Sequence, residues 1–370
     1  MRFHHSARLP ALAAGTLLCS LPVAADVWHH AVTAPFTGEY DSNPAMATAN
    51  EKSVWRAKFS PSYTLTRTSG ADEFKAGLVL NLERSSDESL SASRQDPGLL
   101  LGWQRQTETG EFGLLARYDE ASTRVTELDE SGLLAVDGTR VTRSLAGKWR
   151  TALGERSSLA ADAAYRNVSF DGGSLIDYTN LAGGVTYSYA LSERVEPFMR
   201  ATASHNDPDA VRSSSNYYSA LGGLKWKATE RLDWTVQAGV GRTTGNNGDS
   251  GWQGGLGLHY AIPRGELTLD VGRTVNPSSE GGFAESDQVK GSWGYAIDER
   301  TRSGIDATWR DYKGTTPSTT QQLGAWLNRE LTPFWNARLS YRYKLRQQDG
   351  QPDASSNLLG LTLIYTHPDL

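Results

Sequence analysis

The sequence predicts an all-β chain whose strands close into a transmembrane, antiparallel, up-and-down β-barrel of about 18 strands, with 16 as the alternative count. Three observations carry this prediction. After the first 25 residues, segments of about 10 to 14 residues alternate apolar and polar side chains with period two. Short turns and longer polar loops alternate between these segments. Nine of the 11 tryptophans fall on the apolar face, mostly near a strand end.

The first 25 residues have the layout of a secretory signal peptide. Arg2 and Arg8 form a basic start, an apolar run follows from Leu9 to Ala24, and small residues precede Asp26. The run is too short to cross a bilayer as a helix. We expect cleavage before Asp26, which removes Cys19, the only cysteine. The expected division is a signal peptide over 1–25, a short periplasmic segment over 26–31 and an outer-membrane barrel over 32–370 of a Gram-negative cell.

The alternation is clearest in two segments. One face of the first carries Leu232, Trp234, Val236, Ala238 and Val240, and one face of the second carries Trp335, Ala337, Leu339, Tyr341, Tyr343 and Leu345. A helix would scatter these side chains around its circumference. A soluble β-sandwich is the alternative, but its strands usually run about five or six residues and its outward faces are polar.

The same pattern places the individual strands. We expect them at 31–41, 53–67, 73–85, 97–107, 111–124, 139–151, 156–169, 177–190, 194–206, 214–228, 231–243, 250–262, 265–276, 286–298, 301–312, 318–330, 334–347 and 355–367. Long loops fall at 42–52, 86–96, 125–138 and 277–285, and tight turns lie between them. Short turns typically face the periplasm and long loops the cell exterior, which puts both termini in the periplasm.

The tryptophans of the apolar face are expected to form two membrane girdles. Trp226, Trp234, Trp293 and Trp335 flank tight turns and suit the periplasmic interface, whereas Trp252 and Trp309 border longer loops together with Tyr118 and Tyr165. The predicted girdle residues are Trp55, Trp103, Trp149, Trp226, Trp234, Trp252, Trp293, Trp309 and Trp335.

The polar face of each strand should line the lumen, and its charges are biased. Seventeen inward positions are basic: Arg56, Lys58, Lys75, Arg117, Lys148, Arg150, Arg166, Arg200, Lys225, Lys227, Lys290, Arg302, Arg310, Arg338, Arg342, Lys344 and Arg346. Nine are acidic: Glu39, Glu83, Asp119, Asp162, Glu196, Asp233, Glu266, Asp270 and Asp306. Because the whole chain carries a net charge of −5, acids such as Glu127, Asp129 and Glu130 must gather in loops.

A basic lumen favours anions. The alternative is that these charges form ion-pair ladders with acids on neighbouring strands and merely solvate the barrel wall. A one-residue shift in a few strands would also reduce the predicted basic excess.

No enzyme, cofactor, metal site or nucleic-acid partner is expected. His205 has Ala203 and Asp207 as same-face neighbours, so no serine nucleophile stands at the adjacent outward position. His29 and His30 could bind a metal, but an unstructured start before the first strand explains them more simply. His259 is expected to be a polar lumen residue. The charge balance gives no basic excess that would suggest nucleic acid.

Several short phrases are similar to one family. The strand from Phe36 to Pro44, the pair of phrases Val54–Arg56 and Pro61–Leu65, and the turn phrases Ala190–Pro197 and Glu330–Pro333 resemble the β-barrel porin 2 family, outer-membrane barrels associated with exopolysaccharide export systems. The resemblance implies a role in polysaccharide production or export and carries over no catalytic residue. The chain departs from the usual aromatic end of such barrels, because a short tail follows Tyr365.

These observations lead to a functional expectation. The chain is expected to be a passive, porin-like channel for an exported exopolysaccharide or another anionic solute. Inward aromatic side chains that could help a sugar chain slide are few: Phe198, Tyr217, Tyr312 and Trp326. Expected partners are outer-membrane lipid and lipopolysaccharide, the barrel assembly machinery and periplasmic polysaccharide export proteins. The alternatives are a general small-solute porin and a non-conducting scaffold barrel whose lumen is closed by side chains or by the 125–138 loop.

Overall fold

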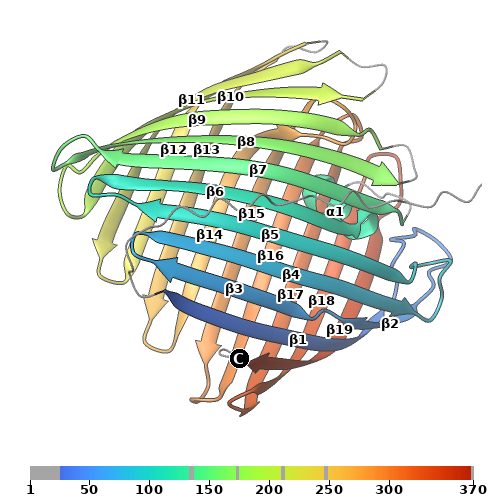
Figure 1. Ribbon diagram of the computed structural model, residues 1–370. Helices are drawn as coiled ribbons and strands as arrows, with labels where there is room; N and C mark the ends of the chain where they lie inside the picture. The colour runs from blue at the N-terminus through green and yellow to red at the C-terminus, as the bar shows by residue number, and fades with distance from the viewer. Residues whose placement is uncertain (1–25, 133–136, 172–174, 210–212, 246–248, 368–370) are drawn as a thin grey trace, which may run out of the picture.

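The computed structural model describes residues 26–132, 137–171, 175–209, 213–245 and 249–367, so the expected signal peptide lies outside the described residues. The described chain is one closed antiparallel β-barrel (Figure 1). Its elements are β1 (Val27–Asp41), β2 (Val54–Phe59), β3 (Ser62–Ser69), β4 (Asp72–Ser85), β5 (Arg94–Gln106), β6 (Gly110–Ser122), α1 (Thr123–Ser131), β7 (Thr139–Ala152), β8 (Ser157–Asp171), β9 (Tyr178–Tyr189), β10 (Val195–Pro208), β11 (Ser215–Thr229), β12 (Leu232–Thr244), β13 (Ser250–Ile262), β14 (Gly265–Pro277), β15 (Phe283–Ala296), β16 (Thr301–Lys313), β17 (Ser318–Thr332), β18 (Trp335–Gln347) and β19 (Ala354–His367).

The barrel has 18 strands although 19 segments are distinguished. Both β2 and β3 pair with β1 and with β4, and the register is the same on either side of the interruption. The interruption falls at Ser60 and Pro61, where proline cannot donate a ladder hydrogen bond. The two segments are therefore halves of one strand, and the predicted count of 18 is confirmed.

The first and last strands close the barrel. β1 pairs with β19 from Val32, opposite His367, to Asp41, opposite Leu358. Strand by strand, each remaining segment pairs with its sequence neighbours, which is the predicted up-and-down order.

The main boundary difference is at the N-terminal end of β1. The sequence predicts a separate periplasmic segment over 26–31, but Val27–Ala31 continues the strand because it pairs with Thr64–Thr68 of β3. His29 and His30 are thus strand residues, and His30 Nδ1 lies 2.6 Å from the Tyr63 hydroxyl.

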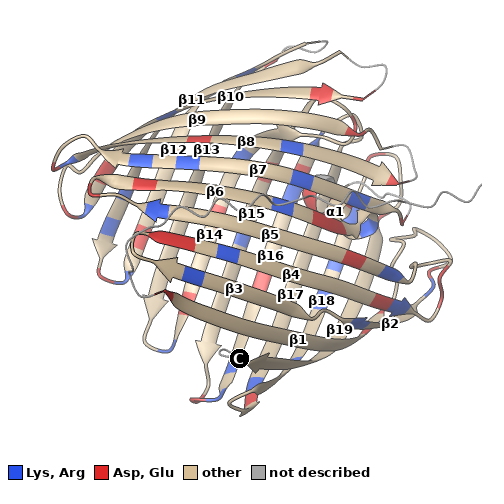
Figure 2. Cartoon of the chain, in the orientation of Figure 1, with Lys and Arg blue, Asp and Glu red and all other residues tan. Residues whose placement is uncertain are grey.

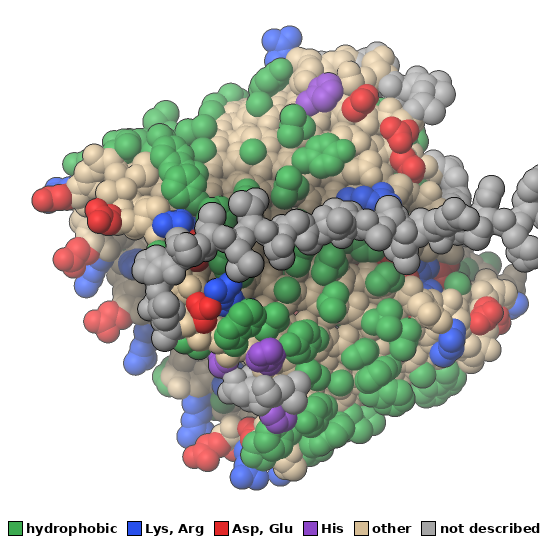
Figure 3. All heavy atoms as spheres, in the orientation of Figure 1, with side chains coloured by type: hydrophobic (Ala, Val, Ile, Leu, Met, Phe, Trp, Pro, Cys, Tyr) green, Lys and Arg blue, Asp and Glu red, His purple; other side chains and the backbone are tan. Residues whose placement is uncertain are grey.

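The outward face of the barrel is apolar. Leucine and valine side chains such as Leu78, Leu181 and Leu361 are more than half exposed there, and Figure 3 shows hydrophobic side chains spread over the wall. The pairing register puts all nine predicted girdle tryptophans on this face. Near the short turns, Trp226 pairs with Trp234, and near the long loops the ring of Trp55 lies 5.0 Å from that of Tyr40. In the described ranges, no helix is long and apolar enough to cross a membrane.

The register places charges of both signs on the inward face, for example Glu39 opposite Arg56. Figure 2 marks the charged residues of both signs along the strands and in the loops. The buried apolar cluster of the described chain is small and consists of Met46, Leu128 and Ala354. These residues come from the β1–β2 loop, from α1 and from the start of β19. The interior is therefore organised around α1 rather than around a conventional hydrophobic core.

A charged side chain introduced on the outward face should destabilise the barrel more than one introduced on the inward face. Val236, which is 47% exposed on the outward face of β12, is followed by the inward Gln237. In lipid bilayers we expect Val236→Arg to lower the free energy of unfolding by about 2–4 kcal/mol, because an arginine then faces hydrocarbon. Gln237→Arg is the matched control and should change it little. Equal losses in denaturant titrations of both variants would contradict the assignment of faces.

Candidate functional site

The connection between β6 and β7 folds into the barrel and crosses its lumen. The sequence predicts only a long loop over 125–138, with closure of the lumen as an alternative role, whereas residues 123–131 form α1 inside the barrel (Figure 1). Leu128 of this helix is buried against Met46 and Ala354. This apolar contact stabilises the inward position of the helix.

The base of this loop is fixed to the wall beside it. Asp137 accepts a hydrogen bond of 2.7 Å from the Ala92 backbone N–H and lies 3.7 Å from Arg94. Arg94 also donates to the Gly138 carbonyl at 2.9 Å. The two ends of the loop are joined by the Thr123 N–H, which donates to the Gly138 carbonyl at 3.0 Å. The loop therefore leaves the wall in one defined direction.

Its far side is bonded to the opposite wall. The Ser279 hydroxyl, between β14 and β15, donates to Glu127 at 2.5 Å. Gln322 of β17 donates to Asp129 at 2.9 Å, and Arg346 of β18 donates to the Gly132 carbonyl at 3.0 Å. The α1 segment thus links β6 and β7 to strands far around the barrel.

Gly132 is required at the end of α1 for two reasons. Its φ of 68° lies in the left-handed region, which suits a helix C-terminus and favours glycine. A Cβ atom at this position would also overlap the Ser318 hydroxyl of β17. The close approach lets Ser318 and Arg346 both donate to the Gly132 carbonyl.

The acids of α1 reduce the predicted basic excess of the lumen. Glu127 and Glu130 both pair with Arg140, at 3.3 and 2.7 Å. Burial raises the pKa of Glu127 despite the hydrogen bond from Ser279 and the charge of Arg140. Because these acids come from a loop rather than a strand, a count of charges on the strands alone overstates how basic the interior is.

Further inward acids were missed for a simpler reason. Asp41, Asp96 and Glu111 pair with Arg56, Arg94 and Lys148, at 2.6, 2.9 and 3.3 Å. They lie at strand ends: Asp96 falls in the predicted loop 86–96, and Asp41 and Glu111 are terminal residues of the predicted strands 31–41 and 111–124.

A cavity of about 250 Å³ lies beside α1. It is lined by Glu127, Glu130, Arg140, Arg166, Tyr178, Asn276, Pro277, Ser278, Ser279, Ala284, Ser286, Arg310 and Tyr312. Arg140 is neutralised by the two glutamates, but Arg166 and Arg310 have no ion-pair partner within 4.0 Å among the described residues. The cavity therefore offers two guanidinium groups to a solute.

The predicted basic lining separates into two groups. Five side chains are in ion pairs, as the ladder alternative predicts: Arg56, Lys58, Lys148, Arg200 and Lys225. The strand register places the other twelve on the inward face without an ion pair in the described part of the chain: Lys75, Arg117, Arg150, Arg166, Lys227, Lys290, Arg302, Arg310, Arg338, Arg342, Lys344 and Arg346.

On β18 the row of four basic residues faces several neighbours. Arg346 bonds to α1, and the guanidinium of Arg338 lies 4.8 Å from the ring centre of Trp326. Arg140, Arg94 and Arg124 are not among the predicted lumen residues. Arg140 stands at an inward position of the predicted strand 139–151, so the alternation alone could have found it.

The predicted inward aromatics lie against the wall rather than projecting into the lumen. Phe198, Tyr217 and Tyr312 are buried. The rings of Phe198, Tyr217 and Trp326 cover Gly223, Gly241 and Gly304 on adjacent strands, where an added Cβ atom would collide with them. Tyr312 instead lines the cavity beside α1 and lies 2.6 Å from the Ser278 hydroxyl.

The histidines form no obvious reaction centre. His205 Nδ1 lies 2.8 Å from the Asn216 amide oxygen, and His259 lies 3.8 Å from both Asp233 and Glu266. Within the ranges that the structure describes, no group of three or more His, Cys, Asp or Glu side chains is placed to hold a metal ion.

Removing the glycine at the end of α1 should release the helix from the opposite wall. We expect Gly132→Val to raise single-channel conductance in planar bilayers, because the side chain strains the backbone and displaces Ser318. Gly350→Val is the matched control: its φ of 75° is also left-handed, but a Cβ there meets nothing within 4 Å. A rise in both variants, or in neither, would contradict the inference that α1 obstructs the lumen.

Comparison with known proteins supports the fold. No protein-family model and no curated protein matches this sequence. Among solved structures, the outer membrane protein OpdK of Pseudomonas aeruginosa is similar, with a TM-score of 0.51 and 10% identity over 91% of this chain and 99% of that one. OpdK with vanillate gives a TM-score of 0.52 and 9% identity, over 92% and 98%. P. aeruginosa OpdO gives 0.50 and 10%, over 92% and 97%. The chain therefore has the barrel fold of outer-membrane porins.

Proposed function

We propose that this chain is a passive outer-membrane channel for small anionic solutes, with its narrowest point beside α1. The observation that carries the proposal is the cavity of about 250 Å³ into which Arg166 and Arg310 present guanidinium groups without ion-pair partners among the described residues. Guanidinium groups bind carboxylates and phosphates through paired, charge-assisted hydrogen bonds. A solute with one such group would find its charge compensated at the constriction.

The size of the cavity favours small solutes. Pockets for drug-sized ligands usually enclose about 300–1,000 Å³, so this cavity suits a compact molecule. Vanillate, an aromatic carboxylate present in one of the similar structures, is a convenient probe of this chemistry. Diffusion along the lumen needs no energy coupling, and a basic constriction raises the local concentration of anions.

The hypothesis of exopolysaccharide export rests only on the resemblance to the β-barrel porin 2 family. None of the contacts described above for the barrel interior supports it. A polymer of this kind would have to pass α1, whose bonds to Ser279, Gln322 and Arg346 span the lumen. The small-solute channel is the simpler proposal for this geometry. Outer-membrane location beside lipopolysaccharide and insertion by the barrel assembly machinery belong to the same proposal. Periplasmic export proteins would be partners only if polymer export holds.

A second candidate is a non-conducting scaffold barrel. The bonds that tie α1 to both walls favour it, because a fixed plug would close the lumen to ions. The two candidates differ in one measurement: the purified wild-type barrel in a planar bilayer conducts potassium chloride in the first case and does not in the second.

The anion preference can be traced to the cavity. Under a salt gradient, we expect the wild-type barrel to favour chloride, and vanillate to block the current. The double variant Arg166→Gln/Arg310→Gln should weaken this block at least about tenfold, because each charge-assisted hydrogen bond contributes about 1.5–3 kcal/mol.

Arg143→Gln makes the same kind of substitution on the outward face of β7, where it removes one positive charge near the Tyr118 ring, and should leave the block unchanged. Cation preference in the wild type, or equal block of all variants, would argue against the proposed site.

A further inference from the structure

The barrel wall is unpaired between β13 and β14 near the long loops. β13 pairs with β12 up to Ser250, and β14 pairs with β15 up to Pro277. The ladder between β13 and β14, however, ends at Gly254 opposite Arg273. Residues 250–253 and 274–277, which would continue it, are not paired with one another. We refer to these two stretches as the β13–β14 gap.

The early end of the β5–β6 ladder differs from this gap. β5 and β6 part above Gly98, next to Pro97, which has no N–H to donate. There Arg94 of β5 donates to the Gly138 carbonyl and the Ala92 N–H donates to Asp137, so the base of the α1 loop is bonded to this end of the wall. No proline interrupts the β13–β14 ladder, since Pro277 is the last residue of its strand.

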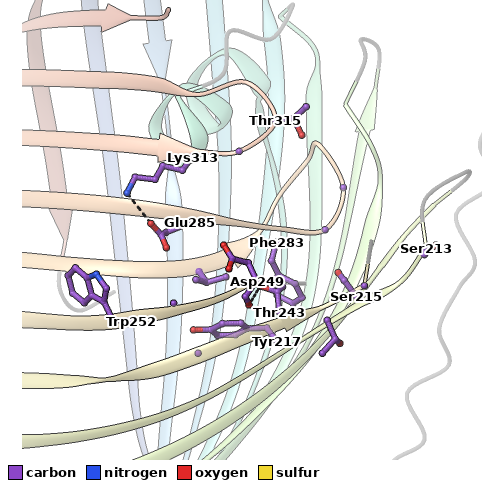
Figure 4. A pocket seen from close by; sticks show the side chains of 18 residues that line it. Ser213, Ser215, Tyr217, Thr243, Asp249, Trp252, Phe283, Glu285, Lys313 and Thr315 are labelled. Atoms are coloured by element: carbon purple, nitrogen blue, oxygen red, sulfur yellow. Dashed lines mark hydrogen bonds and ion pairs between the residues drawn. The ribbon is translucent and has the colours of Figure 1, made fainter. Parts of the chain in front are cut away.

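A cavity of about 440 Å³ occupies the β13–β14 gap (Figure 4). Its lining includes Tyr217, Thr243 and Gly251, which the register places on the inward face, and Trp252, Val275 and Lys313, which it places on the outward face. Glu285, also outward on β15, reaches to within 3.6 Å of the position that a Cβ atom of Gly251 would take. Residues from the two faces of the wall meet only where the wall is open.

The inner part of the gap contains aromatic surface and uncompensated polar atoms. The rings of Tyr217 and Phe283 lie 5.6 Å apart. The Tyr217 hydroxyl donates to the Gln253 amide oxygen at 2.6 Å, while Gln253 Nε2 and the Ser215 hydroxyl are buried without a hydrogen-bond partner among the described residues. A ligand with an aromatic ring and a hydrogen-bonding group would satisfy both features.

The outer mouth lies at the level of the girdle. Trp252 is 60% exposed, and the Arg273 guanidinium lies 4.3 Å from its ring centre. Arg273 is held by Asp287 at 2.6 Å, and Lys313 bridges Glu285 and Asp287 at 3.0 and 2.8 Å. Because these charges compensate one another, the mouth favours an uncharged molecule over an ion.

We propose that the β13–β14 gap is a lateral binding site and passage for small, uncharged aromatic amphiphiles between the lumen and the outer leaflet of the membrane. Its volume lies within the usual range of about 300–1,000 Å³ for small-molecule sites. The proposal rests on the membrane location proposed above but not on the anion selectivity of the constriction. A molecule that moves between the lumen and the outer leaflet through the β13–β14 gap does not have to cross the polar outer surface of the membrane.

The test measures uptake of phenylnaphthylamine, an uncharged dye that fluoresces in lipid, by porin-deficient Gram-negative cells expressing each variant. Gly251→Phe fills the gap and should reduce dye uptake to that of cells without the protein. Gly294→Phe places the same ring on the inward wall near the short turns and should not. Trp252→Ala should accelerate uptake by widening the mouth, whereas Trp309→Ala, another girdle residue, should not.

A reversible closure provides an independent check. The double variant Gly251→Cys/Asn276→Cys joins positions that would face each other if the ladder continued, and the expected mature chain has no other cysteine. Oxidation of this variant should block dye uptake by the cells, and reduction of the disulfide should restore it. Gly255→Cys/Gly272→Cys, on the paired part of the same strands, is the control.

Potassium chloride conductance, measured in parallel, tests whether ions pass along the axis of the lumen. It therefore distinguishes a failure of the lateral passage from a failure of the axial channel. Dye uptake that is unchanged in both Gly251→Phe and the oxidised Gly251→Cys/Asn276→Cys variant, with surface expression confirmed, would overturn the lateral passage. Loss of conductance with normal dye uptake would overturn the axial channel alone.

Discussion

Closure of the backbone ladder between β1 and β19 is the constraint on which the rest of the structure depends. A strand that lies in hydrocarbon must satisfy its N–H and C=O groups through its neighbours, and only a closed sheet achieves this for every strand. Closure also creates two surfaces with opposite requirements, an apolar exterior and a polar interior. The interior is too wide to be filled by strand side chains alone, so α1 supplies contacts across it through Ser279, Gln322 and Arg346. The crossing of the lumen by α1 therefore reflects the barrel's width as much as the loop's sequence.

The strands were predictable because their pattern is local. Alternation over Leu232–Gly241 identifies β12 without knowledge of any neighbour, and the same holds for the Trp335–Arg346 segment of β18. The α1 helix could not be found in this way. Only Val125 and Leu128 are aliphatic in its nine residues, and its partners Ser279, Gln322 and Arg346 are more than 150 positions away in the sequence. The cavity with Arg166 and Arg310 is similarly hidden, since both residues were predicted to face inward but nothing in the sequence brings them beside one helix.

Electrostatics links the strand pattern to the loops. A count of strand residues alone describes a strongly basic wall, and five of its basic residues already have acidic partners on the strands or their ends. The α1 loop adds Glu127 and Glu130, which neutralise Arg140, and Asp137, which lies beside Arg94 and Arg124. The basic side chains that remain without acidic partners, such as Arg166 and Arg310, therefore lie at particular levels along the barrel axis. Local imbalance, rather than total charge, sets the potential that a solute meets inside the barrel.

The inward aromatic rings have a consequence for how such a chain can change over time. Phe198, Tyr217 and Trp326 each rest on a glycine of an adjacent strand, namely Gly223, Gly241 and Gly304. A side chain cannot be added at any of these glycines unless the ring above it shrinks or turns into the lumen, where it would narrow the bore. Each ring and its glycine are therefore coupled positions, at which a substitution of one constrains the other. In related sequences the two positions should vary together, and a pair that loses its glycine but keeps its ring would mark a barrel with a different internal diameter.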